Sequence, residues 1–369
     1  MKRIVIDGRI IASSTGRYVE RLIHYLEILN KENKYFILVP KKDLNLYPLK
    51  NPNFKYVACD IPNFSFKEQL DLIKVIKSLN PDLVHFTMPQ QPLLYNGKRV
   101  TTVHDLTILK TYNSDKNWIV FHIKQLVAKF LFKRIAKLND FIITPSEFTK
   151  KDYIKFSKID PKKVFVTYES AENLSKKEAV YKPLNNQKFI LYVGQQSDYK
   201  NIKNLILAFD QYRKDNPESK VKLVLAGKIN KATEKNLNFV NSSNLIFKED
   251  IIFTNFVKDE ELVWLYKNAI CYAFPSFMEG FGLPGLEAMV YNLPVISSNQ
   301  TCLPEVYQDA AIYFDPYDIK DIQNKIEEII SKKELRDKLI KNGNKLLKKY
   351  SWKKMAKETL EVYKKALDN

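Results

Sequence analysis

Short apolar runs and longer amphipathic segments alternate along the whole chain. Continuous apolar runs bounded by polar residues, Gly or Pro predict buried strands, and apolar residues spaced three or four apart predict helices. The predicted strands cover residues 2–7, 35–40, 55–59, 83–86, 99–103, 141–144, 164–167, 189–193, 221–226, 251–254, 270–274, 295–296 and 311–315. The predicted helices cover residues 18–29, 66–79, 117–138, 202–214, 259–268, 319–347 and 352–367, with two more beginning near residues 147 and 283. This alternation favours an α/β fold with parallel, doubly wound sheets.

The alternation is interrupted over residues 171–187. This segment, AENLSKKEAVYKPLNNQ, is polar and charged and has no clear periodicity, so we interpret it as a linker. A chain of 369 residues is long enough for two domains with separate cores. We therefore predict one domain over residues 1–170, a second over residues 188–350, and a final helical segment over residues 351–369.

Composition and charge narrow the class of partner. Hydrophobic residues make up 45% of the chain and aromatic residues 12%, which argues against a disordered protein. The formal net charge of +18 favours an acidic partner, such as nucleic acid, an anionic membrane or a phosphorylated substrate. The sequence shows no recognisable module of base-stacking aromatics interleaved with the charge, so we expect no nucleic-acid partner.

The cysteines and the apolar runs indicate the cellular compartment of the protein. Cys59, Cys271 and Cys302 are too far apart to indicate a metal cluster, and we expect free thiols in a reducing cytoplasm. The start, MKRIVIDGR, carries charge directly after its short apolar run, which is not typical of a signal peptide. No apolar run approaches the length of a membrane span. We predict a cytoplasmic protein.

Residues 117–138 form a basic, aromatic-rich helical stretch with two compatible interpretations. Ile119, His122, Leu126 and Phe130 share one predicted face. The basic residues lie largely elsewhere on the helix: Lys124, Lys129, Lys133, Arg134 and Lys137. The helix either packs on the sheet through its apolar face or binds an anionic membrane surface, which would place the protein at the inner face of the plasma membrane.

The stretch 274–298, FPSFMEGFGLPGLEAMVYNLPVISS, concentrates the candidate chemistry. It contains three of only nine glycines in the chain: Gly280, Gly282 and Gly285. We predict a loop over residues 279–282 and a helix beginning near Leu283 or Pro284, because proline suits the first turn of a helix. Unpaired backbone N–H groups and the positive end of such a helix favour phosphate binding.

Two glutamates flank this predicted loop. Glu279 and Glu287 are separated by seven residues. Glu287 is too deep in the helix to touch the phosphate, but its carboxylate suits two adjacent ribose hydroxyls. Glu279 can reach whatever lies on the other side of the phosphates. The competing interpretation is a Gly-rich connection with two solvated glutamates.

The same stretch resembles the donor site of retaining glycosyltransferases of family 4, which have the GT-B fold. The family signature is a Glu, seven residues and a second Glu, with GFGLP after the first, and it is complete here. The resemblance implies two Rossmann-like domains facing a cleft, with a final helix that returns to the first domain. It also implies that Glu279 meets the donor sugar and Glu287 the ribose. The remaining donor-binding residues implied in this loop are Gly280, Phe281, Gly282 and Leu283.

Elements of the first domain resemble the family in the same order. Gly16, Arg17 and Tyr18 match its first loop, where the backbone can approach a ligand closely; taken alone, they would be an ordinary strand-to-helix turn. The segment TTVHDLTIL matches its VHDL element. The resemblance places His104 beside the donor sugar, and we take His104 and Asp105 as catalytic candidates with Glu279. The competing interpretation is a histidine hydrogen-bonded by its neighbouring aspartate.

One expected cation is missing from the second domain. The resemblance implies a phosphate-binding lysine at Lys200 and usually an arginine in the same loop, but Gln195 and Tyr199 stand at the two places for that arginine. Arg17 could supply a phosphate contact instead. The chain has no Asp-x-Asp pair, the usual carboxylate clamp for Mg²⁺ or Mn²⁺. We therefore expect no metal site and no cofactor besides the nucleotide-sugar donor.

The resemblance implies retaining transfer of a hexose from a nucleotide sugar to a glycan or a lipid-linked glycan. Within the family, the motifs look most like bacterial mannosyltransferases of surface polysaccharide synthesis, which build O-antigen, capsule or exopolysaccharide. Mannose from GDP-mannose is the leading expectation for the donor, with UDP-sugars as the alternative. An epimerase of the same fold and a basic nucleic-acid-binding protein are alternatives of other classes. An epimerase would need more acid or base groups around the sugar than His104.

Overall fold

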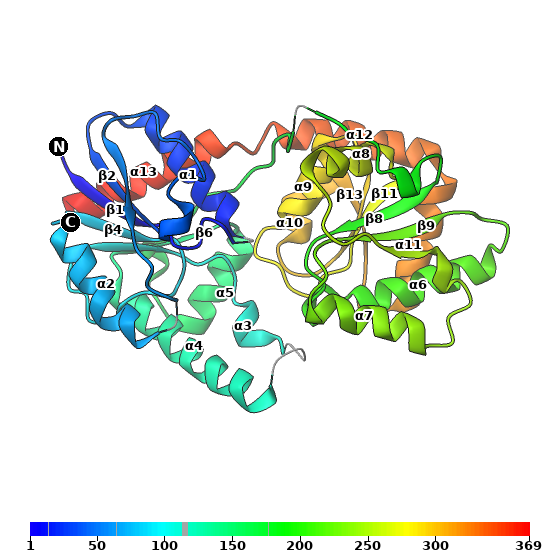
Figure 1. Cartoon of the computed structure of the whole chain (residues 1–369), viewed down its shortest axis with the longest axis horizontal. Helices are drawn as coiled ribbons and strands as arrows, with labels where there is room; N and C mark the ends of the chain where they lie inside the picture. Colours follow the sequence, from blue (N-terminus) through cyan, green and yellow to red (C-terminus); the bar gives the residue numbers. More distant parts are fainter. Residues whose placement is uncertain (14, 64, 113–116, 176) are drawn as a thin grey trace. The chain divides into compact units, whose positions relative to one another are not determined.

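The computed structural model describes residues 1–13, 15–63, 65–112, 117–175 and 177–369, and it divides the chain into two compact units. Unit 1 contains residues 1–109, 124–169 and 351–369, and unit 2 contains residues 110–123 and 170–350. Each unit is built on one sheet in which all described strand pairs are parallel (Figure 1). The α/β fold class predicted from the sequence is therefore confirmed.

The sheet of unit 1 has the strand order β3-β2-β1-β4-β5-β6-β7. Its strands are β1 (Arg3–Asp7), β2 (Lys34–Val39), β3 (Phe54–Ala58), β4 (Leu83–Phe86), β5 (Arg99–Thr102), β6 (Phe141–Thr144) and β7 (Val164–Val166). The helices around it are α1 (Gly16–Leu29), α2 (Phe66–Ser78), α3 (Thr107–Lys110), α4 (Trp118–Leu138), α5 (Glu147–Ser157) and α13 (Trp352–Asp368). The strand order reverses direction between β1 and β4, which is where open α/β sheets bind ligands.

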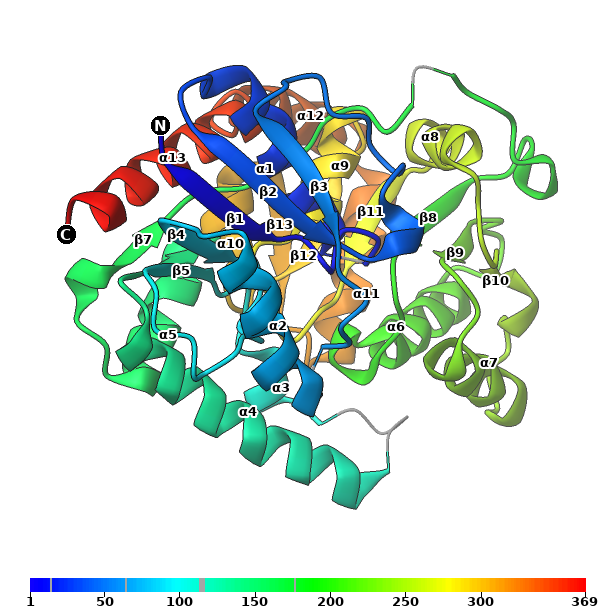
Figure 2. The ribbon, with the colours of Figure 1, turned by 60° about the vertical axis from the view of Figure 1, so that its left-hand side comes forward.

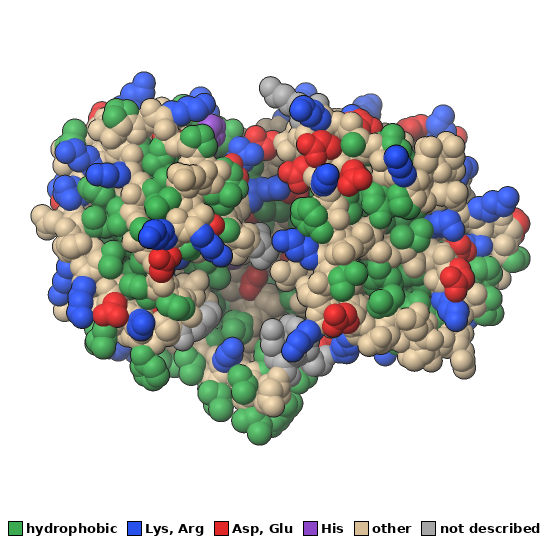
Figure 3. Space-filling model, viewed as in Figure 1, with side chains coloured by type: hydrophobic (Ala, Val, Ile, Leu, Met, Phe, Trp, Pro, Cys, Tyr) green, Lys and Arg blue, Asp and Glu red, His purple; other side chains and the backbone are tan. Residues whose placement is uncertain are grey.

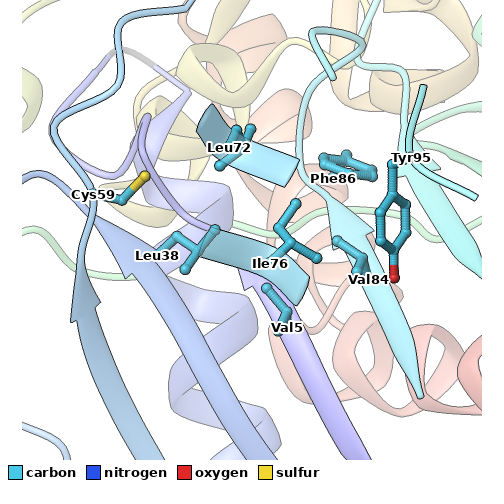
Figure 4. Close-up of a cluster of buried hydrophobic side chains, with 8 residues drawn as sticks. All are labelled: Val5, Leu38, Cys59, Leu72, Ile76, Val84, Phe86 and Tyr95. Carbon is cyan, nitrogen blue, oxygen red and sulfur yellow. The ribbon is translucent and has the colours of Figure 1, made fainter. Parts of the chain in front are cut away.

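The core of unit 1 forms because apolar strands meet apolar helix faces. One buried cluster joins β1, β2 and β4 to α2, and Figure 4 shows Leu72 and Ile76 of α2 above Val5, Leu38 and Val84 of the strands. On the other face of the sheet, α13 packs beside α1 (Figures 1 and 2). Strands covered on both faces must be apolar throughout, which is why they appear as continuous runs in the sequence.

The sheet of unit 2 has the strand order β10-β9-β8-β11-β12-β13, with its reversal between β8 and β11. Its strands are β8 (Phe189–Val193), β9 (Lys222–Ala226), β10 (Ile251–Phe253), β11 (Cys271–Phe274), β12 (Val295–Ser298) and β13 (Ala311–Phe314). Its helices are α6 (Ile202–Asp215), α7 (Lys231–Ser242), α8 (Asp259–Asn268), α9 (Leu283–Val290), α10 (Leu303–Tyr307), α11 (Ile319–Ser331) and α12 (Lys333–Leu347).

The helices differ from the sequence prediction in two ways: α3, α7 and α10 were not predicted, and one predicted helix is divided in two. Helix α7 was not predicted, although Asn230 caps it by accepting from the N–H groups of Ala232 and Thr233. The single helix predicted over residues 319–347 is two helices, because Lys332 has an extended backbone (φ −100°, ψ 95°). The break is stabilised by Arg336, whose Nη1 donates to the carbonyls of Ile329 and Ile330 at the end of α11.

Residues 171–187, which we interpreted as a linker, group with unit 2. The N–H of Leu174 donates to Oη of Tyr291 over 2.7 Å, and the N–H of Ala179 donates to the carbonyl of Glu260 over 3.0 Å. These two backbone bonds fix Leu174 and Ala179 on unit 2. Residues 110–123, predicted in the first domain, also group with unit 2.

Helix α4 packs through one side and leaves the other uncovered. The buried side chains lie in its second half: Ala128, Leu131, Phe132, Ile135 and Ala136. The face that the sequence predicted to be apolar is exposed, with Ile119, Leu126 and Phe130 each more than 60% accessible. In the described part of the chain, none of the helices combines the length and hydropathy needed to cross a bilayer.

Candidate functional site

In unit 2, two loops leave the carboxyl edge of the sheet on either side of the strand reversal. One follows β8 and includes the short 3₁₀ turn Asp198–Lys200, and the other follows β11. The N–H of Phe277 donates to the carbonyl of Tyr199 over 2.8 Å, and Nδ2 of Asn201 donates to the carbonyl of Pro275 over 3.1 Å. These bonds hold the two loops together at the edge where a ligand is expected.

The joined loops bring Lys200 and Glu279 into an ion pair. Nζ of Lys200 lies 2.6 Å from Oε1 of Glu279, and the two side chains are only 14% and 12% exposed. Burial opposes the charge of the ammonium, but the Glu279 carboxylate and the neighbouring tyrosines outweigh it and raise the pKa of Lys200. Lys200 therefore stays charged throughout the physiological range.

The glycine-rich loop ends in helix α9 as predicted. Gly282 precedes the helix with a positive φ of 93°, a region that favours glycine, and Pro284 stands in the first turn. Tyr307, which sequence analysis did not single out, donates its hydroxyl to the carbonyl of Gly282. A Cβ at Gly285 would lie 2.3 Å from the same hydroxyl oxygen, so both glycines are needed for this close packing.

The remaining loop and helix candidates differ in exposure. Glu287 is half-buried on α9, and the Tyr266 hydroxyl donates to its Oε2 over 3.4 Å. Gly280 is buried and Leu283 is half-buried. Phe281 is also buried, and its ring packs edge-on against Tyr350 at 5.7 Å between centroids. The side chain of Phe281 therefore shapes the loop from inside.

In unit 1, His104 lies just past β5, near the reversal of that sheet. Its Nε2 is 3.0 Å from the carbonyl oxygen of Thr87, and its Nδ1 is 3.4 Å from Oε1 of Glu169. The ring of Tyr18 packs edge-on against the imidazole, with centroids 4.8 Å apart. Sequence analysis missed Glu169; the available signal was a carboxylate a few residues beyond the carboxyl end of β7.

Behind His104, a buried polar chain ties α13 to the sheet. Nδ1 of His85 lies 2.6 Å from the Tyr363 hydroxyl, and its Nε2 lies 2.8 Å from Oγ1 of Thr102. The same Thr102 oxygen is 2.9 Å from the Tyr18 hydroxyl. Burial lowers the pKa of His85 to about 3, so this ring is neutral and belongs to the support of the site.

The other candidates of unit 1 have structural roles of their own. Asp105 is not the partner of His104; its Oδ1 accepts from the N–H of Thr107 over 2.8 Å at the start of α3. Gly16 begins α1, where a Cβ would come within 1.9 Å of the carbonyl oxygen of Ile11. Arg17 is half-buried on α1, and its phosphate contact stays a prediction.

Among the described residues, no three His, Cys, Asp or Glu side chains gather in a way that could hold a metal ion. The three cysteines are buried free thiols.

Comparisons with known proteins agree with this arrangement. A model described as Glycosyltransferase Family 4 matches residues 15–169, and one described as Glycosyl transferases group 1 matches residues 175–346. O-antigen chain mannosyltransferase B of Escherichia coli is 28% identical over 278 residues, which cover 72% of this chain and 70% of the relative. O-antigen chain mannosyltransferase RfbU of Salmonella typhimurium is 31% identical over 260 residues, covering 70% and 68%.

Among solved structures, Anabaena HepE in complex with UDP and glucose superposes with a TM-score of 0.74 at 16% sequence identity, covering 99% of this chain and 100% of that one. This similarity extends the agreement in fold over both units. With one family model on each unit and a relative 31% identical over most of both chains, the protein belongs to glycosyltransferase family 4 and has the GT-B fold.

Proposed function

We propose that this enzyme transfers a hexose with retention of anomeric configuration, from a nucleotide sugar to a glycan or lipid-linked glycan of a bacterial surface polysaccharide. Mannose from GDP-mannose is the proposed donor because both curated relatives described above carry mannosyltransferase names. A UDP-sugar is the second candidate, because HepE was solved with UDP and glucose. Family membership favours transfer over the epimerase and nucleic-acid-binding alternatives.

The observation that carries this proposal is the largely buried side-chain pair of Lys200 and Glu279, 14% and 12% exposed, beside the glycine-rich loop. Transfer leaves negative charge on the departing diphosphate, and preorganised donors and cations lower its energy most effectively where water is scarce. The Lys200 ammonium and the N–H groups of the loop supply such charge. Glu279 holds the ammonium in place and, in our proposal, contacts the donor sugar.

The other site residues keep their proposed roles. Glu287 accepts hydrogen bonds from the ribose hydroxyls, while Gly280, Phe281, Gly282 and Leu283 shape and supply the loop. From unit 1, His104 contacts the donor sugar, Gly16 lets the first loop approach the donor, and Arg17 contacts a phosphate. Asp105 acts by positioning the segment after His104, because its carboxylate is engaged with the N–H of Thr107.

Nucleotide preference can be tested without knowing the acceptor. A ligand that binds only the folded protein raises its melting temperature. We expect GDP and GDP-mannose to stabilise the protein more than UDP and UDP-sugars at equal concentration. Radiolabelled sugar should then move from the preferred donor to a polysaccharide or lipid-linked acceptor fraction. If no nucleoside diphosphate shifts the melting temperature and no sugar is transferred, the proposal is wrong.

We also propose that α4 attaches the enzyme to an anionic membrane, where a lipid-linked acceptor would lie. The exposed apolar side chains occur mainly in its first half: Trp118, Ile119, Val120, Ile123, Leu126, Val127 and Phe130. Figure 3 shows hydrophobic side chains gathered over the first turns of this helix, at the bottom of the view. The five basic residues of α4 are exposed as well: Lys124, Lys129, Lys133, Arg134 and Lys137.

This exposed face matches a lipid surface in both chemistry and charge. Apolar and aromatic side chains enter the headgroup region, and each basic residue near an anionic leaflet contributes about 1 kcal/mol. We expect sedimentation with anionic vesicles at low salt, and less at high salt because the attraction is screened. Changing Lys124, Lys129, Lys133 and Lys137 to Gln should abolish it. No sedimentation with anionic vesicles at low salt, or none lost in the variant, would contradict this role.

A further inference from the structure

Both ring nitrogens of His104 face oxygen atoms that only accept hydrogen bonds. Nε2 is 3.0 Å from the carbonyl oxygen of Thr87, and Nδ1 is 3.4 Å from a carboxylate oxygen of Glu169. A neutral imidazole has one N–H and one lone pair, so it can satisfy only one of these oxygens. In the other direction its lone pair would oppose an oxygen.

The surroundings leave the Glu169 carboxylate little access to water. The side chain of Glu169 is 6% exposed and that of His104 is 14% exposed. A buried carboxylate is costly unless it is paired and hydrogen-bonded. A proton on Nδ1 of His104 satisfies the carboxylate and also removes the clash of lone pairs.

We propose that Glu169 is a positioning residue for the transfer reaction: it shares one proton with Nδ1 of His104 and so keeps an N–H on Nε2, directed at the carbonyl of Thr87. This inference rests on the proposed function in that it takes His104 to contact the donor sugar. It assigns His104 the role of hydrogen-bond donor, because neither nitrogen presents a free lone pair.

Two neighbouring helices also contact His104. Tyr18 of α1 packs edge-on against it, and the Thr149 hydroxyl of α5 donates to the His104 carbonyl over 3.5 Å. Other titratable groups around His104 are Tyr18, Asp105, which caps α3, and His85, which is neutral behind Thr102. Within the described part of the chain, Glu169 is the charged group at ion-pair distance from the imidazole ring.

The consequence for the reaction is an exchange of hydrogen-bond acceptors. A sugar oxygen can replace the Thr87 carbonyl as the acceptor from Nε2–H while Glu169 keeps the ring in place. No covalent bond forms or breaks in this exchange, and no proton leaves the His104–Glu169 pair.

The proton can be observed directly by NMR. The chain has four histidines, so ¹⁵N-histidine labelling gives a simple spectrum in which His104→Gln assigns the signal of interest. In the wild type, we expect the N–H on Nδ1, which faces Glu169, and the N–H on Nε2 to be observed together. In Glu169→Gln, the amide can donate to Nδ1, and we expect the neutral Nε2–H form. A neutral His104 in the wild type, or a spectrum unchanged by Glu169→Gln, would overturn the proposal.

Kinetic measurements on variants of Glu169 distinguish a positioning role of its carboxylate from a general effect on the structure. Glu169→Gln should lower kcat/KM roughly 10- to 100-fold, the worth of a hydrogen bond to a charged group, and should alter its pH profile. Glu169→Asp keeps the charge and should recover part of the rate. Glu178→Gln, which removes an exposed carboxylate paired with Lys267, is the control and should change neither. If Glu169→Asp and Glu169→Gln lose the same activity with the same pH profile, the carboxylate is not the positioning group.

The NMR experiment needs no donor or acceptor. A protonated His104 pair in an enzyme that transfers no sugar would refute the proposed function alone. Sugar transfer by an enzyme whose His104 is neutral would refute the positioning role alone.

Discussion

Lys200 and Glu279 provide two variants that should differ in their effect on nucleotide binding. In the structure, the ammonium is 2.6 Å from the carboxylate at the edge of the unit 2 sheet. Lys200→Met removes the cation and leaves a carboxylate beside the loop that we propose binds the diphosphate. Glu279→Gln removes the competing charge and frees the ammonium for phosphate. The first variant should therefore weaken nucleotide binding, and the second should keep or strengthen it.

The expected size follows from the burial of the pair. A hydrogen bond to a charged group contributes about 1.5–3 kcal/mol, so Lys200→Met should raise the Kd for a nucleoside diphosphate roughly 10- to 150-fold. Removing one partner of a buried ion pair costs about 3–5 kcal/mol of stability. With side chains 14% and 12% exposed, some water reaches the pair, and we expect the lower end of that range.

The choice of pH does not complicate this comparison. Because the folded-state pKa of Lys200 is raised, the stability that its charge contributes is fully present below its ordinary pKa of 10.5. It is lost only as the pH rises through the raised value. Experiments near neutrality therefore compare proteins in which the lysine is fully charged.

Isothermal titration calorimetry with GDP and UDP measures the binding, and thermal melting measures the stability. Lys235→Met is the matched control, because Lys235 pairs with Asp198 at 2.9 Å with side chains 52% and 37% exposed. Exposed pairs contribute little, so this variant should melt and bind nearly as the wild type does. If Glu279→Gln weakens nucleotide binding as much as Lys200→Met does, then Lys200 is not the phosphate cation held by Glu279.

Three further predictions concern the ribose, metal and acid stability. Glu287→Ala should weaken nucleotide binding at least several-fold by calorimetry, and unchanged binding in a folded variant would refute the ribose contact. Transfer should persist in EDTA, because Lys200 and the loop N–H groups serve the diphosphate; complete loss that Mn²⁺ restores would show the opposite. His85 is neutral when folded, with its pKa lowered to about 3 by burial, so its contribution to stability falls by about 1.4 kcal/mol per pH unit below its ordinary value of 6.5. His85→Gln should reduce the acid sensitivity of melting, and an identical pH dependence in both proteins would contradict this assignment.

Helix α4 shows where a correct local prediction left the exposed face open. Its periodicity predicted the helix over residues 117–138, and the structure has it at Trp118–Leu138. The apolar residues Ile119, Leu126 and Phe130 nevertheless lie in solvent. Periodicity shows which residues share a face, but which face is covered depends on the neighbours that the fold supplies.

The sequence by itself determined the elements and the local chemistry of the donor loop. Apolar runs predicted every strand to within a few residues, because strands buried on both faces must be apolar. The glycines and Pro284 predicted the loop and the start of α9, because positive φ and a first helical turn select those residues. The family resemblance drawn from the same stretch is confirmed by the comparisons.

Only the tertiary structure decided which of these groups meet. Lys200 and Glu279 are 79 residues apart in the chain and become partners because β8 and β11 are neighbours in the sheet. The contacts of Glu169 with His104 and of Tyr307 with Gly282 have the same cause. In each pair, the two residues lie after or next to strands that the sheet topology brings together. Many strand orders would bury the same apolar runs equally well, so the local sequence pattern does not specify the strand order. Contacts that depend on the strand order follow from the packing of the whole unit.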